Sequence, residues 1–235
     1  LEKQRNIADV LWVAIKTQNA YKNLFFQTEK LVQSRFIEMF GDPITNSMGW
    51  EVLTLKDIAI GKLSYGSGAS ASEFDNETRY IRITDITEDG SLTDDAVSAS
   101  QFDEKYLLKD GDILFARSGS VGRTFRYSDR WGKCMFAGYL IKLTPNLEKV
   151  LPDYLYNYTK SDYYQEFITQ NQKTVTIANI NAQQYGNLTV CLPPLSLQNR
   201  FADFVRQADK SKFELQKAIY ELDATYKSLL RECFR

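Results

Sequence analysis

Apolar residues recur with a seven-residue period through the last forty residues of the chain. They fill two seam positions in each heptad, and the only charged side chain among them is Lys212. The first position holds Phe201, Ala208, Leu215, Leu222 and Leu229, and the second holds Val205, Lys212, Ile219, Tyr226 and Cys233. A heptad pattern kept over this length is typical of a coiled coil rather than of a surface helix. We therefore predict one long helix in this part of the chain.

The first forty residues repeat the last forty without a gap, because a shift of 194 positions aligns nine identical pairs. The pairs are Leu1 with Leu195, Gln4 with Gln198, Ala8 with Ala202, Asp9 with Asp203, Ala14 with Ala208, Lys16 with Lys210, Ser34 with Ser228, Glu38 with Glu232 and Phe40 with Phe234. A repeat whose copies are this far apart is not a solenoid, in which each unit stacks on its neighbour. We interpret it as a helical frame around one inserted domain.

The two copies are expected to pair side by side. Because the chain enters the inserted domain along one helix and leaves it along the other, the pair should be antiparallel and roughly 60 Å long. The expected contact residues are Leu11, Gln18, Phe25, Val32, Val205, Lys212, Leu215, Ile219 and Leu222. Gln18 and Lys212 are repeat counterparts, and a polar group in a seam can set register or partner choice. The alternative is a helical cap packed on its own globular domain.

Glycine and proline mark the ends of both copies. Gly41 supplies a C-cap, and Pro43 prevents the first helix from continuing. Pro193 and Pro194 indicate where the second helix begins. The predicted organisation is a helical arm at 1–41, an inserted domain at 42–192 and a second arm at 193–235.

Short alternating or β-branched runs bounded by turn residues prevail in the inserted domain. The expected strands are 79–86, 113–116, 138–143 and 188–192, and the expected helices are 151–170, 55–59 and 181–185. The predicted fold class is α/β in the α+β sense, with a mixed, strand-rich domain inserted between two long helices that form an antiparallel coiled coil.

Three polar loops of this domain carry side chains suited to DNA. Loop 116–124 follows a buried-looking strand, and its glycines, serines and arginines suit close approach to a phosphate backbone. Loop 172–181 has side chains that can read base edges, and loop 64–70 has a glycine-serine tip that could enter a groove. The candidate DNA-binding residues are Arg117, Ser118, Ser120, Arg123, Lys173, Thr174, Thr176, Asn179, Tyr65 and Ser67. The alternatives are a plain hairpin turn, a solvated loop and a flexible surface loop, respectively.

The composition disfavours several kinds of catalytic and binding site. The 235 residues include no histidine, the commonest general base and metal ligand. Cys134, Cys191 and Cys233 lack CxxC spacing, so neither a disulfide framework nor a zinc site is expected. A net charge of -1 argues against a purely electrostatic nucleic-acid binder. The sequence has no apolar run of membrane-spanning length and no signal-peptide pattern, so we expect no membrane association and a cytoplasmic location.

Several pieces of the sequence resemble the DNA-specificity (S) subunit of type I restriction-modification systems. They are 34–43 (SRFIEMFGDP), 111–122 (GDILFARSGSVG), 177–181 (IANIN) and 192–195 (LPPL) followed by Gln198, and their order and spacing cover nearly the whole chain. The resemblance implies a target-recognition domain similar to that of TaqI-type adenine methyltransferases, in a subunit that does no chemistry itself. It implies double-stranded DNA, modification (M) subunits and restriction (R) subunits as partners. S-adenosylmethionine, ATP and Mg are expected only in those partner subunits, and no cofactor is expected in this chain.

Such subunits usually carry two recognition domains at opposite ends of the coiled coil, each reading half of a split DNA sequence. This sequence has one recognition domain and begins inside the repeated motif. We interpret it as the C-terminal half of a two-domain subunit, or as a half-length chain whose two-fold dimer would restore both domains.

The sequence leaves two alternative classes of protein. An enzyme is disfavoured because the Asn/Asp-Pro-Pro-aromatic motif of adenine methyltransferases is absent. Asp103-Glu104-Lys105 precedes Pro152-Asp153, which is the wrong order for a metal-nuclease motif. A coiled-coil assembly module whose central domain binds protein rather than DNA is the second alternative. We expect a non-catalytic subunit that recognises DNA.

Overall fold

The computed structural model describes residues 2–172 and 179–233. The contacts divide the chain into a helical unit, Leu1–Glu38 with Asp203–Arg235, and a mixed unit, Met39–Ala202. Within the described ranges, no helix combines the length and the apolar character needed to cross a membrane.

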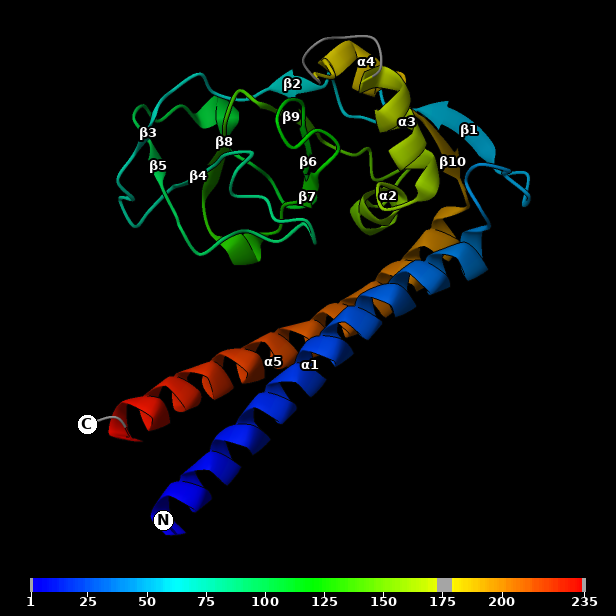
Figure 1. The fold of residues 1–235 in the computed structure, drawn as a ribbon. Coiled ribbons are helices and arrows are strands. Elements are labelled where there is room, and N and C mark those ends of the chain that lie inside the picture. The colour runs from blue at the N-terminus through cyan, green and yellow to red at the C-terminus, as the bar shows by residue number, and fades with distance from the viewer. Residues whose placement is uncertain (1, 173–178, 234–235) are drawn as a thin grey trace. The chain divides into compact units, whose positions relative to one another are not determined.

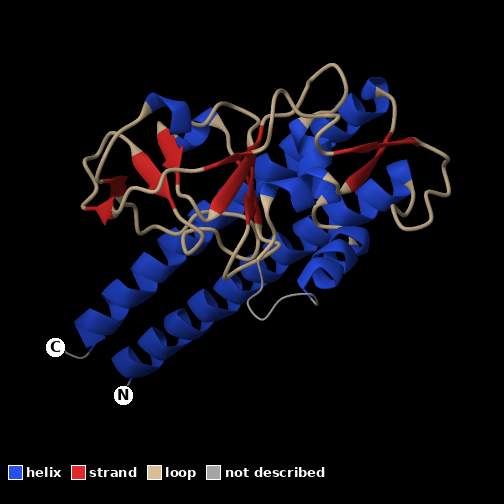
Figure 2. Cartoon of the chain, turned by 90° about the horizontal axis from the view of Figure 1, so that it is seen from above, coloured by secondary structure: helices blue, strands red, loops and turns tan. Residues whose placement is uncertain are grey.

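The helical unit consists of two long helices, α1 (Glu2–Phe40) and α5 (Leu195–Cys233), of 39 residues each. They lie side by side and run antiparallel (Figures 1 and 2). The guanidinium of Arg35 lies 5.9 Å from the ring centre of Phe204, and Glu29 lies 3.9 Å from the Lys212 ammonium. Residue numbers therefore fall along α1 as they rise along α5. The prediction of two long antiparallel paired helices is confirmed.

The seam residues are shielded from solvent in both helices. Val32 and Val205 are buried, and the other expected contact residues are half-buried: Leu11, Gln18, Phe25, Lys212, Leu215, Ile219 and Leu222. The Lys212 ammonium also lies 3.1 Å from Asp209 and 5.9 Å from the ring centre of Phe25. This lysine is thus held between carboxylates of both helices, which offsets the cost of placing a charge in the seam.

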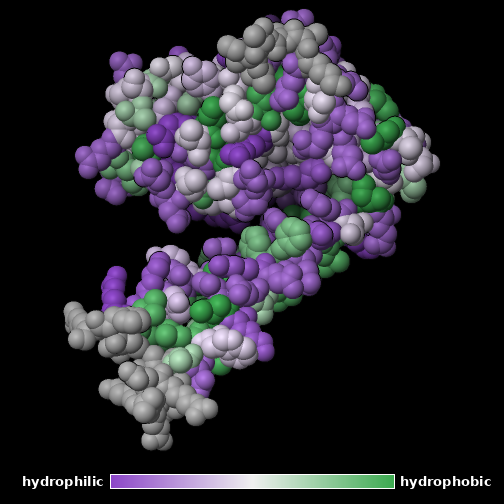
Figure 3. All heavy atoms as spheres, in the orientation of Figure 1, coloured by the Kyte–Doolittle hydropathy of each residue, from purple (hydrophilic) through white to green (hydrophobic). Residues whose placement is uncertain are grey.

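A second row of apolar residues on α1 is exposed. It consists of Val10, Val13, Leu24 and Leu31. Their repeat counterparts in α5 are Phe204, Gln207, Ala218 and Thr225, of which the two apolar ones are half-buried and the two polar ones exposed. Figure 3 shows hydrophobic (green) side chains at the surface of the paired helices. The two copies therefore keep the same seam but differ outside it.

The mixed unit contains ten short strands and three short α-helices among its described residues. The strands are β1 (Glu51–Thr54), β2 (Ser64–Tyr65), β3 (Ala71–Ser72), β4 (Arg79–Ile81), β5 (Ser98–Ala99), β6 (Ile113–Ala116), β7 (Thr124–Arg126), β8 (Cys134–Phe136), β9 (Leu140–Leu143) and β10 (Thr189–Leu192). The helices are α2 (Pro152–Tyr158), α3 (Asp162–Gln172) and α4 (Ala182–Gly186), with 3-10 turns η1 (Glu104–Tyr106) and η2 (Asp129–Trp131).

The largest sheet is antiparallel with strand order β2-β9-β6-β7. Its register pairs Tyr65 with Ile141 and Ile141 with Phe115. Every residue of β6 is buried, which agrees with its interior position and its uninterrupted apolar sequence. The remaining pairs are β1 with β10 and β3 with β5, both antiparallel, and β4 with β8, parallel. The predicted strand-rich mixed fold is confirmed.

Two predicted elements are interrupted. The expected strand 79–86 ends at Ile81, because the Asp85 carboxylate accepts hydrogen bonds from the backbone and guanidinium of Arg82 and closes a turn. The expected helix 151–170 breaks into α2 and α3. There, the Thr159 and Ser161 hydroxyls donate to carbonyls three residues back, at 2.7 Å in both cases. Local side-chain bonds of this kind compete with regular helix and strand.

The two expected short helices differ in outcome. Residues 55–58 form a turn and a bend rather than a helix, and Ala59 forms an isolated bridge with Pro145. The second, at 181–185, is present as α4. Its capping box joins Asn181 and Gln184, so each side chain accepts a backbone N–H of the other residue.

Candidate nucleic-acid interface

Arg117 leaves the end of β6 toward the surface. Residues two apart on a strand share a face, so Arg117 lies on the same face as the buried Phe115. The strand register places Tyr65 on that face as well, two strands away. The guanidinium carbon of Arg117 is 4.7 Å from the centre of the Tyr65 ring, which is within cation-π range. The sheet thus brings together residues from two separate loops.

A third segment meets this pair at Asn179. The segment extends the sheet, because Ser118 and Asn179 form an antiparallel bridge and the Ile180 N–H donates to the Arg117 carbonyl at 2.9 Å. The Nε of Arg117 donates to the Asn179 side-chain oxygen at 3.3 Å. We call Tyr65, Arg117 and Asn179 the Arg117 cluster.

Helix α4 holds the cluster in place through hydrogen bonds. The backbone N–H of Ala182, in the first turn of α4, donates to the Tyr65 hydroxyl at 3.0 Å. N–H groups in the first turn of a helix lack partners within the helix, so the phenol satisfies one of them. The Tyr185 hydroxyl donates to the carbonyl of Ala116 at 2.8 Å, and burial raises the pKa of Tyr185 so that it keeps its proton. The residue before Arg117 is thereby anchored.

The rest of loop 116–124 is a hairpin that joins β6 to β7. Gly119 and Gly122 have φ values of +67° and +90°, which residues other than glycine rarely adopt. These glycines therefore shape the turn. Ser118 and Ser120 are half-buried in the same turn, and the Ser120 carbonyl accepts the N–H of Arg123.

Arg123 points to a different part of the unit. Its guanidinium donates to the Ile86 carbonyl at 3.0 Å and to the Glu88 carboxylate at 3.3 Å. These bonds attach Arg123 to the loop after β4, outside the Arg117 cluster.

Ser67 is buried rather than presented at a loop tip. Its hydroxyl accepts the N–H of Ala69 at 3.1 Å, and its carbonyl accepts the hydroxyl of Tyr80 at 2.7 Å. Lys173, Thr174 and Thr176 lie outside the described residues. The structure thus gathers Tyr65, Arg117, Ser118 and Asn179 from the ten candidates at one place.

Tyr139 was missed in the sequence analysis. It is 62% exposed, and its carbonyl accepts the N–H of Arg117 at 3.1 Å. The only signal in the sequence is an aromatic residue after Gly138 at the start of a strand, which is indistinguishable from a core position.

Gly66, beside Tyr65, provides a test of this geometry. A Cβ at Gly66 would overlap the backbone carbonyl oxygens of Phe136 and Ala137, whereas a Cβ at Gly68 would meet nothing. We expect Gly66→Ala to lower the free energy of unfolding by about 1–3 kcal/mol, as overpacking does. Gly68→Ala should change it by less than about 0.5 kcal/mol, as for ordinary surface substitutions. Urea denaturation measures both, and equal stability of the two variants would contradict the close approach.

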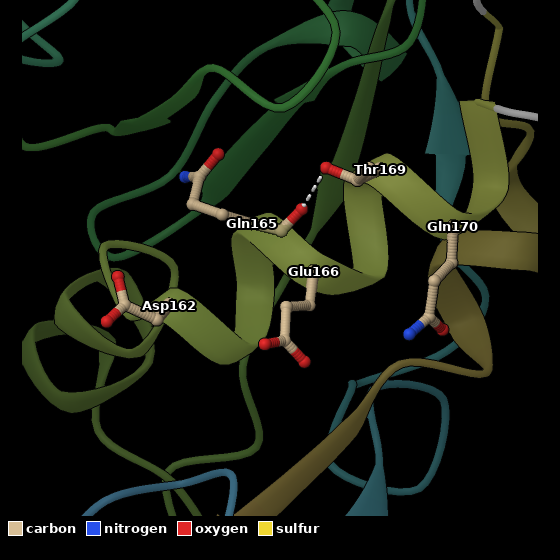
Figure 4. A pocket seen from close by; sticks show the side chains of 5 residues that line it. All are labelled: Asp162, Gln165, Glu166, Thr169 and Gln170. Carbon is tan, nitrogen blue, oxygen red and sulfur yellow. Dashed lines mark hydrogen bonds between the residues drawn. The ribbon is translucent and has the colours of Figure 1, made fainter.

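A shallow hollow on α3 is a poor candidate for DNA. It is lined by Asp162, Gln165, Glu166, Thr169 and Gln170. These side chains fan out from one helix rather than converge (Figure 4), and the lining has two carboxylates and no cation. Carboxylates repel phosphates, so this face is the less suitable one.

The structure also bears on catalytic chemistry. Cys134 and Cys191 are free and buried, and burial raises the pKa of the Cys134 thiol to about 11. Since the thiolate is the nucleophile, Cys134 is unsuited to covalent catalysis. Within residues 2–172 and 179–233, no group of three or more Cys, Asp or Glu side chains is placed to hold a metal ion.

The fold is similar to that of solved S subunits of type I restriction-modification systems. The S subunit from M. genitalium matches with a TM-score of 0.67 at 18% identity, over 97% of this chain and 60% of that chain. The HsdS subunit from Thermoanaerobacter tengcongensis matches with a TM-score of 0.56 at 20% identity, over 100% of this chain and 58% of that chain. A chain from a study of type I R-M complex assembly and conformational transition matches with a TM-score of 0.59 at 20% identity and the same coverage.

The family is shown by the sequence itself. The family model of the type I restriction modification DNA specificity domain matches residues 48–222. The chain belongs to this family, as its motifs suggested. It spans about three fifths of the length of the solved S subunits that it matches.

Proposed function

We propose that this chain is a non-catalytic subunit that reads one half of a bipartite DNA target. The observation that carries the proposal is the Arg117 cluster. Three segments far apart in the sequence converge there, and they hold one arginine against an aromatic ring and an amide. Arginine and amide side chains are the groups that read base edges, while nearby serines and backbone N–H groups suit phosphates.

The paired helices support the bipartite part of the proposal. They are copies of one sequence in opposite directions, so each end of the pair carries equivalent seam residues. Val32 and Val205 lie toward one end, and their counterparts Tyr226 and Leu11 lie toward the other. A pair roughly 60 Å long matches half-sites one or two turns of B-DNA apart, at about 34 Å per turn.

The exposed row on α1 supports assembly with M and R subunits. Val10, Val13, Leu24 and Leu31 expose apolar side chains along one helix, and exposed apolar patches are found at protein interfaces. S-adenosylmethionine, ATP and Mg belong to those partners in this proposal, and methylation and cleavage are their activities. Failure of the M subunit to co-elute with this chain would remove this part of the proposal.

Selection of bound duplexes from a random-sequence pool tests DNA reading. We expect the chain, assembled with the M subunit, to enrich one short motif. Because phosphate contacts release counterions, the logarithm of the association constant should fall linearly with the logarithm of the salt concentration. The slope should be about −0.9 for each phosphate contacted. The readouts are sequencing of the bound pool and a salt titration of affinity for the enriched duplex.

Two results would contradict the proposal. No enriched motif, together with salt-insensitive binding, would favour a central domain that binds protein. Methylation of adenine by the purified chain alone would overturn its non-catalytic role.

A further inference from the structure

We propose that Arg117 reads a guanine in the major groove, with Tyr65 and Asn179 as its positioning residues. This inference rests on the proposed function and deepens it, because it names one base of the half-site.

The guanidinium of Arg117 is fixed on two sides. The Tyr65 ring lies against it at 4.7 Å, and Asn179 accepts the Nε hydrogen at 3.3 Å. Tyr65 is itself bonded to the N–H of Ala182, and Asn179 is placed by the strand-like bridge to Ser118. An arginine side chain loses rotamer freedom when it is ordered. Here the folded chain has already ordered it before DNA arrives.

The two terminal nitrogens of Arg117 remain available. Among the described residues they make no hydrogen bond or ion pair, since only Nε is bonded. With Nε occupied, the guanidinium can donate from its outer edge, where two N–H groups lie side by side. Guanine offers the matching pair of acceptors, O6 and N7, in the major groove, and no other base has two acceptors there.

The surroundings favour a base over a phosphate. The groups in contact with the guanidinium are a phenol ring and an amide, and neither carries a charge that would help to bind a phosphate. A fixed donor pair adds specificity only toward a partner with fixed acceptors, whereas a phosphate accepts from many directions. Arg123, by contrast, is already paired with Glu88.

The experiment uses the chain assembled with the M subunit and the motif enriched from the random pool. Arg117→Lys keeps the charge but removes the planar donor pair. We expect it to weaken the preference for guanine at one position, because an ammonium can still donate to O6 and N7 but without a fixed geometry, and to lower affinity for the motif about 10- to 100-fold. Affinity for a random duplex should change less than about 3-fold, because the charge is retained.

Base analogues locate the contact. Replacing that guanine by 7-deazaguanine removes N7 and should weaken binding of the wild-type chain more than binding of the lysine variant. Inosine removes only the minor-groove amine and should leave binding unchanged. Tyr65→Leu and Asn179→Ala should each reduce the preference at this same position and no other, which a general loss of structure would not do.

Arg130→Lys is the matched control. Arg130 also lies over an aromatic ring, that of Trp131 at 5.2 Å, but it belongs to η2. We expect the full motif from this variant. Thermal unfolding of each variant establishes that it is folded.

The possible results separate the two claims. If the wild-type chain enriches a motif that Arg117→Lys reads unchanged and that tolerates 7-deazaguanine at every guanine, the guanine contact is wrong and the proposed function stands. If the variant loses affinity equally for motif and random DNA, Arg117 binds phosphate and the inference is overturned. If the wild-type chain enriches nothing, the proposed function and this inference fail together.

Discussion

Replacing Gln198 by leucine should destabilise the mixed unit by about 3 kcal/mol, because each buried polar group left without a partner costs about 1–3 kcal/mol. The side chain is fully buried in the first turn of α5. Its oxygen accepts the N–H of Leu151 at 2.8 Å, and its nitrogen donates to the carbonyls of Pro193 and Lys149 at 2.8 and 3.2 Å. Leucine fills a similar volume but forms a hydrogen bond with none of these three backbone groups. The loss should lower the melting temperature by roughly 6–12 °C.

The matched control is Gln207→Leu on the same helix, where the side chain is exposed. We expect it to change stability by less than about 0.5 kcal/mol. Differential scanning calorimetry of both variants makes the comparison. Similar melting temperatures would show that the bonds of Gln198 contribute nothing to stability.

Replacing Asp112 by alanine should cost about 3–5 kcal/mol, the usual effect of breaking a buried ion pair. Asp112 is completely buried between loop and sheet. Its carboxylate lies 3.7 Å from the Lys142 ammonium and accepts the Thr144 hydroxyl at 2.5 Å and the N–H of Lys109 at 2.8 Å. The Lys142 side chain is 16% exposed, so without Asp112 its charge would lie in a largely dry site.

A double-mutant cycle separates the charge from the packing. Asp112→Ala with Lys142→Met removes both charges and should recover at least about 1 kcal/mol relative to the sum of the single changes. Asp110→Ala, two residues away and exposed, is the control and should be nearly neutral. Chemical denaturation in a Trp12→Phe background, followed by the fluorescence of Trp50 and Trp131, reports on this unit. A strictly additive cycle would mean that the two charges do not interact.

The helical arms could be predicted from sequence because their signal is local and long. A heptad repeated over forty residues leaves few other ways to bury Leu11, Val32 and Val205. The duplication gave a second copy of the same pattern. Only the direction of pairing needed a further argument, from the way the chain enters and leaves the inserted domain.

The breaks inside predicted elements depend on single side chains and could not be predicted from periodicity. Asp85 ends a strand by binding Arg82, although the alternation of residues 79–86 continues past that point. Thr159 and Ser161 end one helix and begin another by bonding to nearby carbonyls. Such bonds offer the backbone an alternative to regular helix or strand. The two conformations differ little in free energy, so residue propensities do not show which one forms.

The candidate site was predicted as separate loops and not as a cluster. Arg117 and Asn179 are 62 residues apart, and nothing in their local sequence indicates that they share a hydrogen bond. Ser67 and Tyr65 belong to one polar loop, yet one is buried beneath Tyr80 and the other is exposed. The register of β2, β9 and β6 decides these outcomes, and register is a property of the whole sheet.

Both long helices cross the border of the compact mixed unit. Met39 and Phe40 of α1 and Leu195–Ala202 of α5 belong to this unit. Phe40 packs against Tyr154 and Phe201, with ring centres 4.8 and 5.3 Å apart. A segment exchanged between two relatives would therefore keep this packing only if its junctions lay inside the helices, before Met39 in α1 and after Ala202 in α5.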